Sequence, residues 1–312
     1  MFRSVVVLMV TCCGVLADDS AVSTQERQRA AEIERGSRIA KAGFRNEDDI
    51  CRKFNAWQTD KDARDWLRAM NVRPEEIRSV RATTIHGHKA DLEVRIRTSS
   101  AAHAEKESKG EKNAAGESVQ GISVKLVSSS NGFNQIDKRW LKTYARMWKM
   151  PPDVVAAMKL YLGESPPQGK TRRANRMYLS ELPVASRRAV VAFFRSHKSR
   201  IISDLLRGDG AHAADWFMVT LKSEQGPPRW TIRSVQETIR FYSEGDVVMT
   251  RYGNLKLGRI SMQRKGGDNG RPTANMLQFK LNPARLFTAR RPSTPNSKSI
   301  KSDLADSPAG TL

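Results

Sequence analysis

The stretch GISVKLVSSSNGFNQIDKRW (residues 121–140) decides the fold, because it joins an alternating strand to a polar loop and then to a helix. Apolar residues at positions 122, 124 and 126 alternate with Ser123 and Lys125. We therefore expect a β-strand that buries the apolar set and presents Ser123 and Lys125 together. A lysine two residues after a polar ligand is the second half of a metal-dependent nuclease signature.

The first half of that signature is an aspartate on a neighbouring strand, and Asp91 qualifies. In ADLEVRI (90–96), Asp91 and Glu93 alternate with apolar residues. Pairing the two strands would place Asp91, Glu93, Ser123 and Lys125 on one face of a sheet. By spacing alone, a solvated aspartate and a surface lysine remain the commoner explanation.

Charge is the strongest signal in the composition. The 312 residues include 54 Lys and Arg against 33 Asp and Glu, a net charge of +21, which predicts a polyanionic partner. Because the basic residues are spread along the chain, nucleic acid is expected rather than a membrane. The three cysteines form neither a disulfide framework nor a zinc-ligand spacing, so we expect a reducing cytoplasm.

The ends of the chain differ from its middle. Residues 1–17 have an early arginine and an apolar run like a secretory signal peptide. We discount that segment, because a basic domain without disulfides follows it. We expect residues 1–32 to be a signal-like or mistakenly started leader that is frayed or disordered, residues 33–287 to be one domain, and residues 288–312 to be a disordered Ser/Pro/Lys tail. A mobile loop is expected at residues 99–120 inside the domain.

Periodicity and capping residues predict alternating helices and strands. Asn46 is expected to cap the first clear helix, over residues 46–57, and Ser234 with Glu237 forms a capping box. Helices are further expected at 61–70, 136–149, 152–162 and 183–206, the last as one helix or a broken pair. Strands are expected at 79–85, 90–97, 121–127, 214–221, 230–233 and 276–281, with a hairpin of 247–251 and 255–262 around Gly253-Asn254.

Four stretches carry a resemblance to a known family: KAGFRNEDDI (41–50), VKLVSSSNGFNQIDKRWL (124–141), ISDLLRGDGAHAADW (202–216) and QRKGGDNGRPTANMLQFK (263–280). Through them the chain resembles the HinP-type type II restriction endonucleases of the PD-(D/E)xK nuclease superfamily. The resemblance implies a three-layer α/β/α fold with a central mixed β-sheet. It also implies magnesium-dependent cleavage of double-stranded DNA at GCGC or a close variant.

The resemblance assigns roles to the residues of the signature. Asp91 matches the metal-binding aspartate and Lys125 the catalytic lysine. Ser123 stands where the relatives have glutamine or an acidic residue, and a hydroxyl is a weaker ligand for Mg²⁺. Glu93 on the same strand face, or Glu47 in the first helix, is therefore expected to supply a compensating ligand.

Two further segments are expected to contact DNA. Residues 131–138 would form a loop whose Phe133 and Gln135 enter a groove, the alternative being an ordinary turn with Phe133 in the core. Residues 263–271 offer Arg and Lys donors for guanine and Asp268 for cytosine N4, the alternative being a basic turn that contacts phosphates only. The DNA-binding candidates are Phe133, Asn134, Gln135, Lys138, Gln263, Arg264, Lys265, Asp268, Asn269 and Arg271.

The resulting hypothesis is a restriction endonuclease that works beside a cognate DNA methyltransferase. The alternatives are a nickase or repair-type nuclease, and a DNA-binding protein made catalytically weak by Ser123. A basic RNA-binding protein would explain the charge but not the arrangement of Asp91 and Lys125. A palindromic site suits a homodimer, or a monomer that nicks each strand in turn.

Overall fold

The computed structural model describes residues 18–99, 116–224, 226–267 and 271–289. The signal-like segment 1–17 and the tail from residue 290 lie outside these ranges. By internal contacts the chain divides into two compact units, Met1–Leu126 and Val127–Leu312. The expected single domain thus consists of two compact units.

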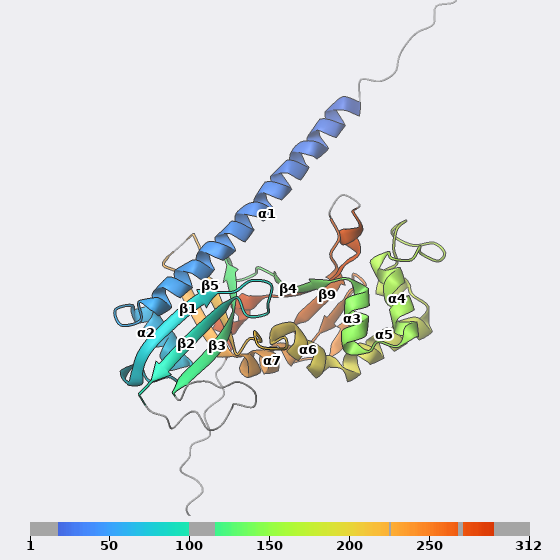
Figure 1. The fold of residues 1–312 in the computed structure, drawn as a ribbon. Helices are drawn as coiled ribbons and strands as arrows, with labels where there is room; N and C mark the ends of the chain where they lie inside the picture. Colours follow the sequence, from blue (N-terminus) through green and yellow to red (C-terminus); the bar gives the residue numbers. More distant parts are fainter. Residues whose placement is uncertain (1–17, 100–115, 225, 268–270, 290–312) are drawn as a thin grey trace, which may run out of the picture. The chain divides into compact units, whose positions relative to one another are not determined.

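The helices of the first unit are α1 (Asp18–Asn55), α2 (Lys61–Ala69) and the short 3-10 helix η1 (Pro74–Glu76). The prediction that Asn46 caps a helix is wrong, because α1 continues through it and Asn46 is buried. Residues 18–45 are rich in Ala, Glu and Arg, which favour helix, so α1 includes residues 18–32 of the expected leader (Figure 1). No helix within the described ranges is long and apolar enough to cross a membrane.

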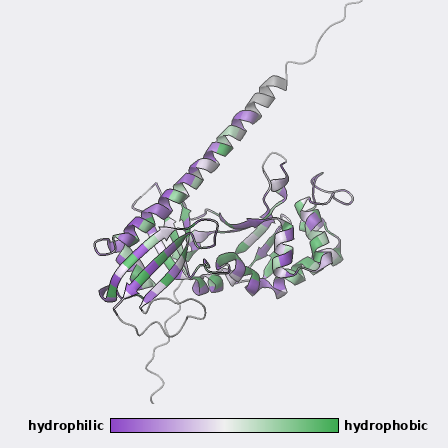
Figure 2. Cartoon of the chain, viewed as in Figure 1, coloured by the Kyte–Doolittle hydropathy of each residue, from purple (hydrophilic) through white to green (hydrophobic). Residues whose placement is uncertain are grey.

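The strands of the first unit are β1 (Ile77–Thr84), β2 (Leu92–Thr98) and β3 (Glu117–Val127), which pair antiparallel in that order. Leu92 lies opposite Ile122, and Glu93 lies opposite Gly121. Figure 2 shows apolar and polar residues alternating along these strands. β3 begins at Glu117, so the last four residues of the expected loop 99–120 belong to a strand, held there by pairing with β2.

Sheets in the second unit are built from strands far apart in sequence. Its five-stranded antiparallel sheet has the order β4 (Asn134–Arg139), β10 (Leu277–Leu281), β9 (Ile260–Arg264), β8 (Leu255–Leu257) and β7 (Val247–Met249). β5 (Trp216–Leu221) and β6 (Arg229–Ser234) form a further antiparallel pair. The α/β class with a mixed central sheet is confirmed.

Helices of the second unit supply much of its core. They are α3 (Leu141–Trp148), α4 (Pro152–Leu162), α5 (Val184–Ser196), α6 (Lys198–Leu206) and α7 (Val235–Ser243), with 3-10 helices η3 (Leu179–Glu181), η5 (Pro272–Asn275) and η6 (Pro283–Phe287). The broken pair at 183–206 is confirmed, with His197 between α5 and α6. The Ser234/Glu237 capping box is confirmed as well, with Glu237 N donating to Ser234 Oγ at 3.2 Å.

Residues 134–139 form β4, where the sequence predicted a loop running into a helix from residue 136. Pairing with β10 provides backbone partners that local sequence does not reveal. Asp137 is buried on this strand, where it accepts hydrogen bonds from Tyr144 and from both Nε and Nη2 of Arg139. A buried carboxylate satisfied in this way stabilises the strand and lets the helix start only at Leu141.

Candidate active site

Asp91 stands at the residue immediately before β2, and its backbone is held on both sides. Its N–H donates to Ile122 O at 2.9 Å, and its carbonyl accepts from Ile85 N at 2.9 Å. These bonds continue the antiparallel pairing one residue past Leu92, so Asp91 lies opposite Ser123 of β3. The predicted juxtaposition of Asp91, Ser123 and Lys125 is therefore present.

Three donors converge on one oxygen of Asp91. Oδ2 accepts from Val124 N at 2.7 Å, from Lys125 Nζ at 3.1 Å and from Ser123 Oγ at 3.3 Å. Lys125 Nζ also donates to Ser123 Oγ at 3.1 Å and to Val124 O at 2.7 Å. The carboxylate and the ammonium are thus fixed by charge-assisted bonds, and Oδ1 takes no part in them.

Ser123 is part of this network and is not placed as an outward ligand. Its side chain lies between Asp91 and Lys125, and the residue is only 2% exposed. β3 is buried on both faces here, since Ile122 and Val124 are buried too. The role of Ser123 as a metal ligand stays a prediction, and its geometry favours a link between Asp91 and Lys125.

Glu47 of α1 shares a pocket with Asp91. The pocket has a volume of about 450 Å³ and is lined by Phe44, Glu47, Asp48, Ile85, His86, Gly87 and Asp91. Burial, followed by the negative charge of Asp91, raises the pKa of Glu47 to about 7, while Lys125 lowers it. Two carboxylates that line one partly buried pocket, where the charge of one raises the pKa of the other, are donors of the kind that a cation site requires.

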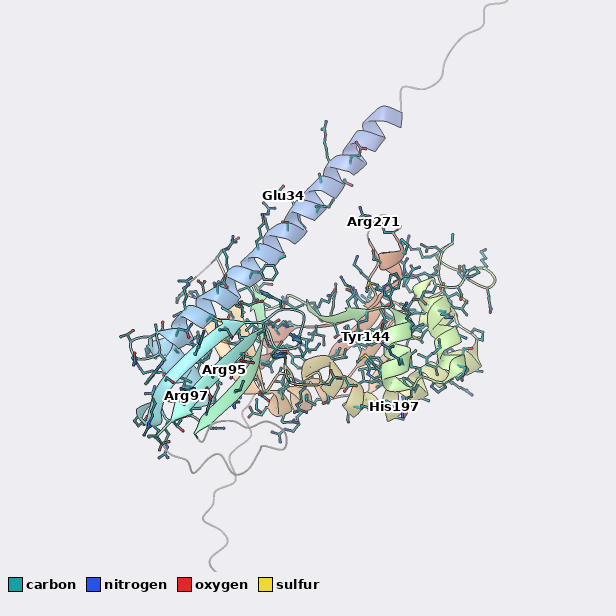
Figure 3. The ribbon with its side chains drawn as sticks, viewed as in Figure 1. Glu34, Arg95, Arg97, Tyr144, His197 and Arg271 are labelled. Atoms are coloured by element: carbon teal, nitrogen blue, oxygen red, sulfur yellow. The ribbon has the colours of Figure 1, made fainter. Side chains whose placement is uncertain are left out.

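Glu93 lies on the same strand face but is engaged elsewhere. Its carboxylate pairs with Arg95 at 2.7 Å, and it does not line the pocket that contains Asp91 and Glu47. Figure 3 labels Arg95 and Arg97, which follow one another on alternate residues of β2. Of the two compensating ligands predicted from the sequence, the geometry favours Glu47.

The donor set fits magnesium in particular. Within the described ranges no group of three or more His, Cys, Asp and Glu side chains is placed to hold a metal. Mg²⁺ retains several waters and is commonly bound through one or two carboxylates together with substrate phosphate oxygens. Asp91 and Glu47 match that requirement, whereas a zinc or calcium site would need more protein ligands.

Phe44 and His86 were not predicted as site residues, yet both line the pocket. Their rings meet edge to face, with centroids 5.9 Å apart. Phe44 gives no signal in the sequence, because it lies outside the buried stripe of α1 and is exposed. His86 belongs to a polar turn before Asp91, and only the fold shows that this turn closes one side of the pocket.

The first segment expected to contact DNA projects an aromatic ring into solvent. Phe133 is 55% exposed just before β4, so the alternative that placed it in the core is wrong. Asn134 and Gln135 are the first residues of β4, and Gln135 is exposed. Lys138 lies opposite Gln278 of β10, which in turn lies opposite Gln263 of β9. Lys138 and Gln263 therefore share one face of the sheet.

Arg264 is held by hydrogen bonds within the second unit. Its Nε donates to Leu162 O at 2.8 Å, and its Nη2 donates to Asn275 Oδ1 at 2.6 Å. Asn275 Nδ2 then donates to Gly163 O at 2.9 Å. The base contact of Arg264 stays a prediction, and in this structure its guanidinium fastens β9 to the end of α4.

The rest of the second segment is a loop held at its stem. Lys265 N donates to Met276 O at 2.8 Å, and Gly266 N donates to Ala274 O at 2.9 Å. Arg271 is exposed beyond that stem (Figure 3). Asp268 and Asn269 lie outside the described residues. Lys265 and Arg271 thus remain candidates at the two sides of the loop.

The chain matches the model of a known family over most of its length. The model of the R.HinP1I restriction endonuclease family matches residues 70–287, which include Asp91, Ser123, Lys125 and the loop after β9 but not Glu47. A comparison with curated proteins gives no match. Among solved structures, the chain is similar to restriction endonuclease MspI in complex with its cognate DNA. The TM-score is 0.48 at 13% identity, over 75% of this chain and 83% of that chain.

Proposed function

Because the chain belongs to the R.HinP1I restriction endonuclease family and is thus a type II site-specific nuclease, we propose that it cleaves duplex DNA at GCGC or a close variant with Mg²⁺. The observation that carries the catalytic part is the convergence of Lys125, Ser123 and the Val124 N–H on Asp91 Oδ2 beside Glu47. GCGC rests on the resemblance and on the donors of the loop after β9.

Asp91 and Glu47 would hold the magnesium ion. When bound, it would polarise the scissile phosphate and favour attack by water. Burial and the charge of Asp91 raise the pKa of Glu47, and a cation bound beside the two carboxylates would lower it again, because positive charge favours the ionised form. Ser123 supports the site indirectly, since its hydroxyl keeps Asp91 and Lys125 in register.

Lys125 supplies the positive charge for the reaction. Its Nζ is already oriented by three acceptors, Asp91 Oδ2, Ser123 Oγ and Val124 O, so little reorganisation accompanies its action. A scissile phosphate beside Asp91 would lie within reach of the ammonium. Lys125 would then stabilise the negative charge that develops on the phosphate or orient the attacking water.

The second unit would read the site. Phe133, which is exposed just before β4, would wedge into a base step, and the exposed Gln135 of β4 would contact the same groove. Lys265 and Arg271 would donate to guanine O6 and N7, with Asp268 accepting from cytosine N4. A nuclease that cleaves a short palindrome would also cleave the host's own DNA, so we expect a cognate DNA methyltransferase that protects it. Cleavage would proceed in a homodimer or by successive nicks.

The test is digestion of plasmid DNA by the chain starting at Gln25, with Mg²⁺ or with EDTA, followed by sequencing of the fragment ends. We expect discrete ends at GCGC with Mg²⁺ only, and no cutting by Lys125→Ala. Lys256→Ala, which removes an exposed lysine from β8, is the matched control and should cut like the parent. Intact plasmid from a folded chain that still retards GCGC duplexes would indicate a DNA-binding protein without nuclease activity.

A further inference from the structure

Two loops of the second unit form a basic and aromatic surface. One is the connection between α4 and η3, and the other is the turn between β7 and β8. We call it the Arg-Tyr surface; its residues are Arg172, Arg173, Arg176, Tyr178, Arg251 and Tyr252. None of these residues is used by the proposed catalytic site or by the two predicted DNA-contacting segments.

Tyr178 is the centre of this surface. The Arg172 guanidinium lies 3.9 Å from the centroid of its ring, and the Arg176 guanidinium lies 4.1 Å from it. Two groups this near one centroid must occupy opposite faces of the ring. A hydrogen bond from Arg173 to the hydroxyl lowers the pKa of Tyr178. Three cations around one phenol repel each other, and this arrangement would be stabilised by an anion.

Among the residues that the structure describes, only part of that charge is neutralised. Arg172 Nε donates to Glu181 Oε1 at 2.9 Å, which leaves Arg173 and Arg251 as the exposed cations. Arg251 lies 4.6 Å from the ring centroid of Tyr252, which is 59% exposed. Guanidinium groups on rigid aromatic supports suit phosphate oxygens, because stacking holds the planar fork in place.

Gly253 fastens the two loops together. Leu179 N donates to Gly253 O at 3.0 Å, and a Cβ at Gly253 would lie 2.7 Å from Tyr178 Cβ and 3.0 Å from Arg172 Nη2. With φ at +74°, this position also favours glycine for its backbone. The close approach places Arg251 and Tyr252 beside Arg172 and Tyr178 as one built surface.

The Arg-Tyr surface is continuous with the loop expected to read bases. A Cβ at Gly163 would lie 2.5 Å from Asn175 O and 3.5 Å from Asn275 Oδ1, so the two loops touch there. Arg264 anchors the base-reading loop at Leu162, and burial followed by the charge of Arg176 lowers the pKa of Arg264. Figure 3 labels Arg271 at one side of that loop.

We propose that the Arg-Tyr surface binds backbone phosphates of the DNA that flanks the recognition site, with Arg173 and Arg251 as the phosphate-contacting cations. This inference rests on the proposed function, since it takes duplex DNA as the occupant. Such contacts position the duplex and strengthen binding to every sequence equally. Arg172 and Arg176 are positioning residues that hold Tyr178.

The test compares Arg173→Gln/Arg251→Gln with Arg207→Gln/Arg240→Gln, which removes the exposed arginine that follows α6 and an exposed arginine of α7. Affinity for duplexes with and without GCGC is measured without Mg²⁺ over a range of salt concentrations. Two lost phosphate contacts should weaken binding to both duplexes by about tenfold or more and reduce the salt slope by about 2. The affinity ratio between the two duplexes should stay unchanged.

A second measurement locates the contacts on the DNA. Single phosphates flanking GCGC are replaced by neutral methylphosphonates, and those that weaken binding of the parent should have no effect on the double variant. If the parent binds duplex DNA and the double variant binds it with the same affinity as the control variant, the proposed role of the Arg-Tyr surface is overturned. The proposed function would remain intact. A parent chain that does not bind duplex DNA would overturn both. Thermal unfolding checks that both variants are folded.

Discussion

Lys125 Nζ lies 3.1 Å from Asp91 Oδ2, the same oxygen that accepts the Val124 backbone N–H at 2.7 Å. The residue that carries the negative charge is therefore held by the strand that carries the positive one. An asparagine at position 91 would remove the negative charge and keep the shape of the side chain. Its effect on cleavage can therefore be distinguished from an effect on folding.

Asp91→Asn should reduce the cleavage rate at least 100-fold, because it removes the charge that would hold the cation and balance Lys125. Binding of GCGC duplexes should stay within a few-fold of the parent. Single-turnover cleavage and gel retardation measure the two quantities. Asp153→Asn, an exposed change in the first turn of α4, is the control. Equal cutting by both variants would remove Asp91 from the mechanism.

Ser123→Ala separates a linking serine from a metal ligand. If the Ser123 hydroxyl only bridges Asp91 and Lys125, it contributes about 1 kcal/mol to stability through its hydrogen bonds. Its loss should then slow cleavage by less than about tenfold. As a ligand, its loss should raise the magnesium concentration needed for half-maximal cutting in the way Asp91→Asn does. Cleavage measured over a magnesium series decides between these outcomes.

Glu47→Gln should change how stability depends on pH. The pKa of Glu47 is about 7 in the folded chain against an ordinary 4.5. As pH rises from 4.5 to 7 the unfolded chain loses this proton first, so the wild-type free energy of unfolding falls, and the loss is complete above pH 7. Glutamine cannot ionise. The variant should therefore equal the parent near pH 4 and exceed it by about 1–2 kcal/mol at pH 8.

Urea unfolding in EDTA at a series of pH values measures this difference, since EDTA keeps metal from masking it. A variant that is less stable than the parent at pH 8 would show that Glu47 is ionised and stabilised in the folded chain. The cause assigned to its raised pKa would then be wrong.

Gly253→Ala should destabilise the second unit more than Gly210→Ala does. Both glycines have φ of +74°, but a Cβ at Gly253 meets Tyr178 at 2.7 Å, whereas a Cβ at Gly210 meets nothing within 4 Å. The backbone cost is about 1 kcal/mol at either position, and the clash adds about 1–3 kcal/mol at Gly253. Thermal unfolding of both variants isolates the clash, and equal losses would contradict the close approach.

Arg264→Ala should lower stability and leave sequence choice unchanged, because the guanidinium bonds to Leu162 O and Asn275 Oδ1. Breaking half-buried bonds of this kind costs about 1–3 kcal/mol. Arg271→Ala should do the reverse, with stability kept and discrimination against altered sites reduced by about 1–3 kcal/mol. Unfolding curves together with cleavage of singly substituted sites test both.

Sequence pattern alone predicted the nuclease strands. Period-two alternation placed Asp91, Ser123 and Lys125 on one face, because a strand has no other way to arrange them. Local signals also found the Ser234 capping box and the break between α5 and α6. The resemblance to the HinP-type enzymes is confirmed over residues 70–287.

Sequence pattern did not predict the contacts between segments that are distant in the chain. The sequence pattern predicts loop and helix where β4 forms, because the pairing partner β10 lies about 140 residues away in the chain and leaves no local signal. Arg264 reads as a base-contacting residue in its basic loop, and only its bonds to Leu162 and Asn275 show it as an anchor. Asn46 has the chemistry of a cap, but α1 runs on through it.

The sequence by itself determined the residues of the candidate site and their family, since alternation and motif order are local properties of the chain. Tertiary structure decided which groups share space with them. Glu47 reaches the pocket of Asp91 because α1 packs on the strands of the first unit. The Arg-Tyr surface exists because Gly253 lets two loops, separated by about 70 residues, approach to van der Waals contact. Such proximity is set by packing, which no local pattern encodes.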